Sequence, residues 1–391
     1  MPKPKSTGLA RTRERQDPHS TGRDPTVAAA AARVGGPPGR RATINDIARL
    51  ANVSKKTVSR VINQSPFVKD ETRARIDAVI QQAGYSPDPQ ARGLAFRRAF
   101  LIGLVYDNPN PQYVVQMQDG ALDALRGSGF ELVVHPCERD SPGFVAGVRG
   151  FIERQKLHGV ILTPPVSEDP VLAQAIGHLD CHCVRIASVR LDPTARMIVS
   201  HERAAAAEAA AHLADLGHTL IGFIAGPAHH ASSHERQGGF LAALAARGLS
   251  VAPRRLVAGA YTFESGIACA EQLLTVSPRP TAIFASNDEM AAGVYKAAFR
   301  LKIAIPEQLS VVGFDDTPLA SRLTPALTTI RLPIREMGRL AAARLIPPGV
   351  AEDTDAALTS PVTPHLVVRD STGPLDQSPR PAVRDSTRSA R

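Results

Sequence analysis

Residues 43–87 read TINDIARLANVSKKTVSRVINQSPFVKDETRARIDAVIQQAGYSP, the most informative stretch of the chain. Its apolar residues recur at spacings of three and four, which predicts three short amphipathic helices. Thr43 is the expected N-cap of the first helix, and Asp46 completes a capping box with it. A tight turn then leads to Ser54, the expected cap of the second helix. Gly84 is expected to end the third helix.

The second helix of this stretch has a basic, hydroxyl-bearing side. Val58, Val61 and Ile62 are expected to face the interior of the bundle. The side chains that remain for the outer side are Lys55, Lys56, Thr57, Ser59 and Arg60. Two short helices joined by a tight turn, the second one basic, are typical of a helix-turn-helix, in which such side chains contact bases and phosphates of the major groove. The alternative is an ordinary three-helix bundle whose basic side is simply solvated.

Charge separates this N-terminal part from the rest of the 391-residue chain. Residues 1–98 hold 19 Lys and Arg against 8 Asp and Glu, whereas the formal net charge of the whole chain is +9. The remaining residues therefore sum to about −2. A basic module beside a near-neutral body favours a polyanionic partner. The alternative is a solvated basic tail on an enzyme.

Cysteine content and hydropathy bear on the compartment. The four cysteines are too few for a disulfide framework. No apolar run approaches the ~18–20 residues needed to span a bilayer, and the basic N-terminus has no apolar segment behind it, as a signal peptide would. We therefore expect a cytoplasmic, nucleoid-associated protein with no membrane partner.

The middle of the chain alternates apolar strands with amphipathic helices. Strands are expected at 101–106, 132–135, 160–163, 220–225, 281–285 and 309–314. Near-continuous apolar strands separated by helices indicate parallel sheets covered on both faces, an α/β fold. About 245 residues are many for one such sheet, so two similar lobes hinged together are expected. Neither G-x-G-x-x-G nor G-x-x-x-x-G-K-[ST] follows any strand, so no nucleotide cofactor is expected.

Composition divides the chain into five segments. We expect a disordered basic extension over 1–40, a helix-turn-helix domain over 41–86, a hinge linker over 87–99 and the two-lobed body over 100–346. The remaining 347–391 are Pro-rich and polar, and we expect them to be mostly disordered apart from one short strand near 366–369.

The run TINDIARLANVSKKTVSRVIN at 43–63 closely resembles the DNA-binding signature of the LacI-type (lactose/galactose repressor) family of bacterial regulators. That resemblance implies that Lys55, Lys56 and Arg60 contact bases. It also implies a group of phosphate-binding or supporting side chains: Thr43, Ser54, Thr57, Ser59 and Asn63. Double-stranded DNA is thus the expected partner.

Residues 84–98, GYSPDPQARGLAFRR, resemble the hinge of the same family. In that family the hinge becomes helical on DNA and inserts a leucine into the minor groove, where an apolar wedge unstacks a base step. Leu94 stands at that position. The alternative is an exposed linker leucine.

Three further stretches, at 200–227, 282–317 and 325–342, resemble the effector domain of this family, which is itself similar to periplasmic sugar-binding proteins. The resemblance covers roughly 43–346 and implies that the two-lobed body binds an effector and forms a homodimer.

The same resemblance implies that Arg236, Asn287 and Asp315 contact the effector. A forked donor, an amide and a carboxylate suit the hydroxyl groups of a sugar or sugar derivative, and ligands bind at the carboxyl ends of strands in open α/β sheets. The alternatives are a surface ion pair for Arg236 and turn caps for Asn287 and Asp315. The neighbouring Asp288 and Asp316 are expected to be structural partners.

The loop after the first strand is expected to complete the pocket. Many family members place a carboxylate where this chain has Ala187-Ser188, so other polar groups are needed. Asp107, Asn108 and Tyr113 are the candidates.

A short run of histidines and cysteines is not expected to bind metal. The run contains His178, Cys181, His182 and Cys183. Alternate residues of a strand face opposite sides, so these side chains do not form a closed tetrahedral site. His229-His230 is interpreted as a loop at the edge of the cleft.

Together these features predict a transcriptional repressor whose affinity for a pseudo-palindromic operator is controlled by a small sugar-like effector. No enzymatic activity and no cofactor are expected. The alternatives are a sugar receptor with an incidental basic N-terminus and a sugar-processing α/β enzyme, although the nucleophile sequence G-x-S-x-G does not occur.

Overall fold

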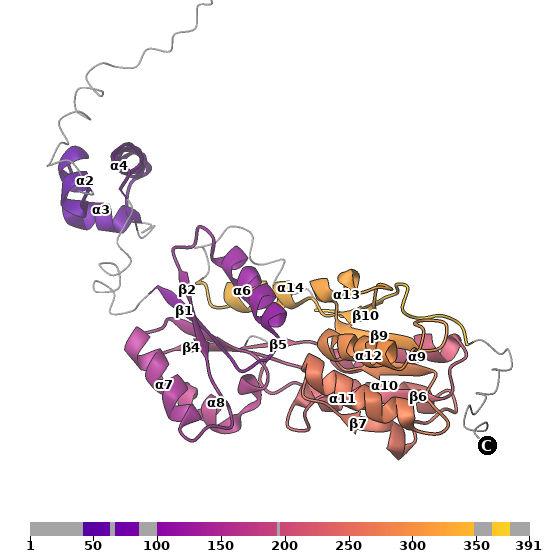
Figure 1. Ribbon diagram of the computed structural model, residues 1–391. Helices are drawn as coiled ribbons and strands as arrows, with labels where there is room; N and C mark the ends of the chain where they lie inside the picture. Colours follow the sequence, from indigo (N-terminus) through magenta and orange to yellow (C-terminus); the bar gives the residue numbers. More distant parts are fainter. Residues whose placement is uncertain (1–41, 63–66, 86–99, 194–195, 348–361, 376–391) are drawn as a thin grey trace, which may run out of the picture. The chain divides into compact units, whose positions relative to one another are not determined.

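The computed structural model describes residues 42–62, 67–85, 100–193, 196–347 and 362–375 (Figure 1). The chain divides into two compact units, Met1–Ala91 and Arg92–Arg391. The described part of the first unit is a small helical bundle, and that of the second is an α/β body. No helix in these ranges combines the length and the apolar composition needed to cross a bilayer.

The helical bundle has a compact apolar core. Its helices are α2 (Ile44–Leu50), α3 (Lys55–Ile62) and α4 (Asp70–Ala83). Each contributes one completely buried side chain, Ile47, Val58 and Ile76 respectively. Burial of one such side chain stabilises a fold by about 1.5–3 kcal/mol, so these contacts hold the short helices in place.

The predicted helix ends are confirmed. Thr43 Oγ1 accepts from the Asp46 N–H at 3.4 Å, and Asp46 Oδ2 accepts from the Thr43 N–H at 2.9 Å, which completes the capping box. Ser54 Oγ accepts from the Thr57 N–H at 3.0 Å at the start of α3. Gly84 closes α4 in the left-handed conformation, with φ +56°, which suits glycine.

The first lobe of the body is a parallel sheet between two layers of helices (Figure 1). Its strands are β1 (Leu101–Tyr106), β2 (Glu131–Pro136), β3 (Gly159–Leu162), β4 (His182–Ala187) and β5 (Met197–Val199), in the order β2-β1-β3-β4-β5. One face carries α6 (Pro111–Leu125) and α14 (Ile334–Ala343), and the other carries α7 (Phe144–Gln155) and α8 (Pro170–Gly177). The short helix η1 (Val166–Glu168) follows β3.

The second lobe repeats this plan with one added strand. Its strands are β6 (Ile221–Ala225), β7 (Leu256–Ala258), β8 (Ala282–Ala285), β9 (Ser310–Asp315), β10 (Thr328–Arg331) and β11 (His365–Val367), in the order β11-β10-β9-β8-β6-β7. The helices α9 (Glu202–Asp215) and α10 (Ala231–Ala245) cover one face, and α11 (Phe263–Thr275) and α12 (Asp288–Arg300) the other. The short helices η3 (Pro253–Arg255) and α13 (Pro318–Arg322) lie in its connections.

The prediction of two α/β lobes is confirmed, and each predicted strand lies within one residue of an observed one. Strand β4 was not among the predicted ranges, and neither were the three short strands β5, β7 and β10. The short strands are three or four residues long, and pairing with longer neighbours stabilises them more than their own composition does.

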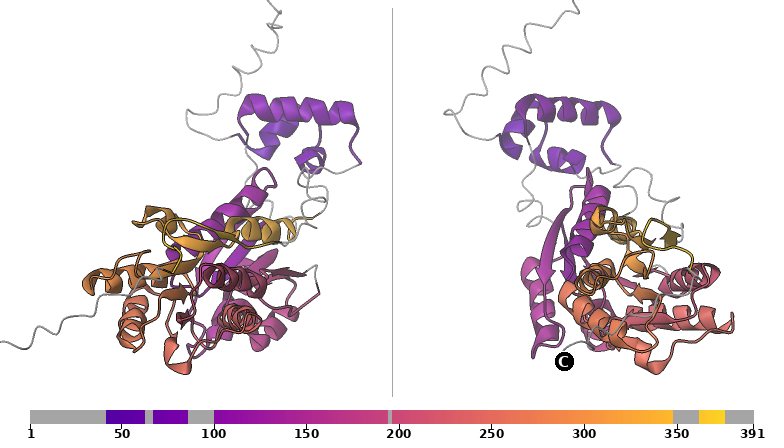
Figure 2. Two further views of the ribbon diagram at one scale, coloured as in Figure 1. Left: turned by 90° about the vertical axis from the view of Figure 1, so that its right-hand side faces the viewer. Right: turned by 45° about the vertical axis from the view of Figure 1, so that its right-hand side comes forward.

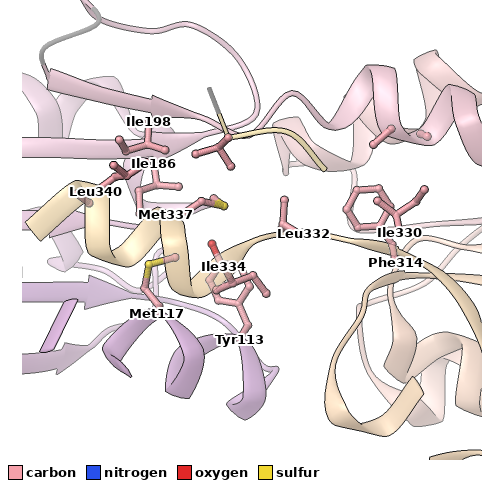
Figure 3. Packing of buried hydrophobic residues seen from close by; sticks show 14 of the residues in the cluster. Tyr113, Met117, Ile186, Ile198, Phe314, Ile330, Leu332, Ile334, Met337 and Leu340 are labelled. Carbon is pink, nitrogen blue, oxygen red and sulfur yellow. The ribbon is translucent and has the colours of Figure 1, made fainter. Parts of the chain in front are cut away.

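The chain crosses between the lobes more than once, which ties them together (Figure 2). After β10 it returns to the first lobe, where α14 packs closely against α6. A side-chain carbon at Gly120 or at Gly338 would overlap the backbone of the facing helix, so glycine is needed at both positions. Figure 3 shows Met337 of α14 between Met117 of α6 and Ile186 of β4.

Residues 362–375 are the described part of the tail beyond residue 347, and they contain the short strand expected near 366–369. The strand β11 pairs antiparallel with β10. Ser371 is fully buried, where its Oγ donates to the Val311 carbonyl at 2.6 Å and accepts from the Thr328 N–H at 2.7 Å. The segment therefore completes the edge of the second sheet. The expected extension over 1–40, the hinge linker over 87–99 and residues 348–361 and 376–391 of the tail lie outside the described residues.

Candidate nucleic-acid interface and ligand cleft

The basic side of α3 faces away from the core of the helical unit. Lys55, Lys56 and Arg60 are exposed, and Thr57 and Ser59 are half-buried beside them. Within the described residues, no carboxylate pairs with any of the three cations. Their charges are therefore available to an external polyanion, as the sequence predicts.

The other predicted DNA-binding residues differ in their position. Ser54 is exposed, and its hydroxyl lies 2.8 Å from that of Thr57. Thr43 donates its hydroxyl to Asp46 at 2.6 Å, so its side chain is engaged in capping α2. Asn63 and Leu94 lie outside the described residues.

A cleft in the α/β body is lined by side chains of both lobes. Asn108, Asn110, Tyr113 and Pro164 line it from the first lobe. Glu202, His230, Ser232, Arg236, Tyr261, Asn287 and Asp315 line it from the second, and Leu332 lies on the crossing that follows β10. The cleft encloses about 460 Å³ including its open mouth.

Arg236 is the central cation of this cleft. Its Nε donates to Glu202 Oε2 at 2.6 Å, and its Nη1 donates to the Ser286 carbonyl. Nη2 lies 3.6 Å from Asp315 Oδ1, and the guanidinium carbon lies 3.7 Å from the centroid of the Phe314 ring. The side chain is only 7% exposed, so Arg236 is not the surface ion-pair residue of the alternative interpretation.

Asp315 and Asn287 lie at the carboxyl ends of β9 and β8, as predicted. Burial raises the pKa of Asp315 well above its ordinary value, although the nearby Arg236 opposes this shift. Asn287 caps α12 by accepting from the Met290 N–H at 2.9 Å, and its Nδ2 donates to the Tyr261 carbonyl at 2.9 Å. The cap interpretation of Asn287 is therefore correct, and the residue also lines the cleft.

Of the predicted first-lobe residues, Asn108 and Tyr113 line the cleft and Asp107 does not. Asp107 Oδ2 instead accepts from the Arg139 N–H at 2.8 Å, which holds the loop after β2. Burial raises the pKa of Tyr113, so its hydroxyl stays protonated. Asp107 was a plausible candidate because it begins a polar loop, but its side chain turns toward a neighbouring loop.

Several cleft residues were not predicted from the sequence. Glu202 accepts a hydrogen bond from Arg236, and the Tyr261 ring lies 5.7 Å from the Arg236 guanidinium carbon. Asn110 caps α6. An Asn directly before a Pro at a helix start is a recognisable cap signal, but it does not reveal a ligand site. His230, expected at the cleft edge, lines the cleft, and burial lowers the pKa of its imidazole to about 4.

The acidic neighbours of the site are structural, as expected. Asp288 accepts from the Thr317 N–H at 2.7 Å and from the Thr329 hydroxyl at 2.6 Å. Asp316 forms ion pairs with Arg331 and Arg369, both at 2.6 Å. Among the described residues, no three His, Cys, Asp or Glu side chains form a group that could hold a metal ion.

Two family models match the chain. Residues 43–88 match bacterial regulatory proteins of the lacI family, and residues 210–372 match the periplasmic binding protein-like domain. The ribose operon repressor of Escherichia coli (strain K12) is 31% identical over 305 residues, which cover 78% of this chain and 92% of that protein. The chain belongs to the lacI family.

Other lacI-family proteins give the same result. The HTH-type transcriptional repressor PurR of Proteus mirabilis (strain HI4320) is 31% identical over 335 residues, 84% of this chain and 96% of that protein. The lac repressor dimer bound to operator and the anti-inducer ONPF has a TM-score of 0.68 at 26% identity, covering 85% of this chain and 100% of that chain. A complex of the regulator CelR with cellobiose has a TM-score of 0.60 at 28% identity, with the same coverage.

Membership of the lacI family confirms the predicted fold class and the predicted function as a DNA-binding transcriptional regulator. The helical unit corresponds to the family's DNA-binding domain, and the two-lobed body contains the periplasmic binding protein-like domain.

Proposed function

We propose that this lacI-family regulator is a homodimeric repressor that binds a pseudo-palindromic operator and responds to a small sugar-like effector. The observation that carries the proposal is the exposed side of α3, where Lys55, Lys56 and Arg60 lie together without a described carboxylate partner. A two-fold symmetric dimer presents two such helices to the two half-sites of an operator. The lac repressor dimer on operator is a precedent for this assembly.

The contacts divide by chemistry. Lys55, Lys56 and Arg60 read base acceptors in the major groove, because long cationic side chains near the start of a recognition helix reach that far. Ser54, Thr57 and Ser59 contact phosphates or orient these cations, whereas Thr43 acts through its cap on α2. By resemblance, Asn63 contacts or supports contacts with the DNA phosphates, and Leu94 inserts into the minor groove as a wedge.

The cleft is the effector site in this proposal. Side chains of both lobes line it, so a bound ligand contacts both and biases the angle between them. Arg236, Asn287, Asp315, Asn108 and Tyr113 supply polar groups at its wall. Because the operator and effector sites are distinct, effector binding and DNA binding change each other's affinity by the same factor. The CelR–cellobiose complex and the ribose operon repressor support a sugar as the effector.

The proposal also covers the organisation and location of the chain. Residues 41–86 form the DNA-binding domain, 87–99 the hinge and 100–346 the effector-binding and dimerisation body, to which 362–375 belong as well. The protein acts in the cytoplasm at the nucleoid and has no enzymatic activity of its own, since regulation needs only binding.

Fluorescence anisotropy with labelled duplex DNA tests the proposal. The full-length protein is expected to bind with an affinity that falls steeply as the salt concentration rises. The reason is that lysine and arginine side chains release the counterions bound to the DNA phosphates. A variant with Lys55, Lys56 and Arg60 all changed to alanine is expected to lose at least tenfold in affinity. Unchanged affinity in this variant would favour the sugar-receptor alternative, and turnover of a bound sugar would favour the enzyme.

A further inference from the structure

The charged side chains of the ligand cleft pair with one another. Among the described residues that line it, Arg236 is the only arginine or lysine, and Glu202 and Asp315 are the only carboxylates. Every nitrogen of the guanidinium lies near an acceptor of the protein: Glu202 at 2.6 Å, the Ser286 carbonyl, and Asp315 at 3.6 Å. The Phe314 ring covers one face of the guanidinium. The cation is therefore already neutralised by the protein.

No other described group in the cleft supplies positive charge. Burial, His229 and Arg236 lower the pKa of His230 to about 4, so its imidazole is neutral near pH 7. With Arg236, Glu202 and Asp315 charged, the cleft has a net charge of −1, and with Asp315 protonated it is neutral. An anion would therefore lose its hydration without meeting an uncompensated cation.

A buried amide donor at the same cleft has no hydrogen-bond partner among the described residues. Asn110 Oδ1 accepts from the Gln112 N–H at 3.0 Å and from the Tyr113 N–H at 3.4 Å, which caps α6. These bonds occupy the amide oxygen. The Nδ2 group of Asn110 therefore remains to face a ligand in the cleft. The residue is 3% exposed, and within the described ranges nothing accepts from its Nδ2. An acceptor atom of a ligand would complete its hydrogen bonding.

We infer that the cleft is specific for an uncharged polyhydroxyl molecule, that Asn110 Nδ2 donates to one of its oxygens, and that phosphorylated or carboxylated forms are rejected. This inference rests on the proposed function, because it names the chemical class of the effector. Hydroxyl groups can both donate and accept, so they satisfy the amide and the carboxylates at once. An ionised carboxylate can only accept hydrogen bonds, and an ionised phosphate carries at least one negative charge, so either would be repelled by Glu202 and by Asp315 where that residue is ionised.

Inorganic phosphate tests the exclusion of anions by isothermal titration of the full-length chain at constant ionic strength. Glu202→Gln keeps the size of the side chain and removes one negative charge, so the net charge of the cleft rises by one. Glu235→Gln is the matched control: Glu235 lies on the same helix as Arg236 and pairs with the exposed Arg203, away from the cleft. The E202Q variant is expected to bind phosphate at least tenfold more tightly than the wild type and E235Q. Equal affinity in all three proteins would overturn the inference.

Pairs of neutral and anionic sugars test the exclusion of anions on the wild-type protein. The probes are D-ribose, D-glucose, D-galactose and cellobiose, with ribose 5-phosphate, glucose 6-phosphate and galacturonate as anionic counterparts. The neutral member of a pair is expected to bind at least tenfold more tightly. An anionic member that binds more tightly would overturn the inference, and the phosphate titration decides the matter even if none of these sugars binds.

Asn110→Asp tests the amide donor. Aspartate is as good a helix cap as asparagine, so α6 is expected to stay capped while affinity for a bound neutral sugar falls at least tenfold. Unchanged sugar affinity would remove Asn110 from the site. A neutral sugar that binds but leaves DNA affinity unaltered would count against the proposed function. The inference that the cleft rejects anions would still stand.

Discussion

Glu202 Oε2 lies 2.6 Å from Arg236 Nε, and both side chains are more than nine-tenths buried. Ser200 also donates its hydroxyl to Glu202 Oε1 at 2.6 Å, which fixes the carboxylate. The pair joins the start of α9 to α10 beneath the cleft. It thus links the stability of the second lobe to the chemistry of the ligand site.

Arg236→Met is expected to destabilise the protein by about 3–5 kcal/mol, because it leaves the carboxylate of Glu202 buried without its cation. Chemical denaturation measures this change. The double variant Glu202→Leu with Arg236→Met removes both charges, and it is expected to recover part of the loss. A double variant less stable than R236M alone would show that the ion pair itself is not the cause.

Arg60→Ala is expected to reduce specific DNA affinity by about 1–3 kcal/mol and to relax the preference at one base position. The physical reason is the loss of a forked donor to base acceptors. Arg75→Ala, which removes an exposed arginine of α4, serves as the control and is expected to have little effect. An equal loss on random DNA would mean that Arg60 contacts only phosphate.

Asp288 is expected to make stability depend on pH. Burial raises its pKa from 3.8 to about 7, although hydrogen bonds from Thr329 and Thr317 oppose the shift. A group with a raised folded-state pKa stabilises the protein fully below its unfolded pKa, and this contribution is lost as pH rises toward the folded value. The wild type should therefore lose up to about 4 kcal/mol between pH 4 and pH 7 from this group.

Asp288→Asn removes this titration. Urea denaturation of both proteins at intervals of one pH unit isolates the contribution of Asp288, since the other titrating groups are shared. The difference in unfolding free energy is expected to shift in favour of Asp288→Asn as pH rises from 4 to 7 and to level off above pH 7. A difference that stays constant with pH would contradict the raised pKa.

Gly120→Ala is expected to destabilise the protein by about 1–3 kcal/mol, because the added methyl group overlaps the backbone of α14. Gly147→Ala is the matched control within helix α7, where a side-chain carbon would meet nothing within 4 Å. That change is expected to be neutral or to stabilise by up to about 1 kcal/mol, since alanine favours helix. Thermal melts that rank the two variants in the opposite order would refute the close helix contact.

The helical unit was predictable from sequence because the features that define it lie within a few residues of one another. Caps such as Thr43 and Ser54 bond to groups three residues away, and one apolar stripe per helix suffices to define the bundle. The six predicted strands of the body were recognisable for the same reason, since each is a nearly continuous apolar run.

The cleft was predictable only in part. Arg236, Asn287 and Asp315 followed from resemblance, but the partner of Arg236 lies 34 residues away at the start of another helix. Asn110 carried a cap signal that says nothing of a ligand. A short strand near 366–369 was predicted, and β11 lies there, but its pairing with β10 was not predictable because the partner strand is distant in the sequence.

Selection of binding sites from a pool of random duplexes is the most direct test of the central claim, that the exposed side of α3 reads DNA. The full-length protein is expected to enrich an inverted repeat of two half-sites, and the variant with Lys55, Lys56 and Arg60 replaced by alanine is expected to enrich none. Enrichment of the same repeat by both proteins, or of no sequence by the wild type, would contradict the account.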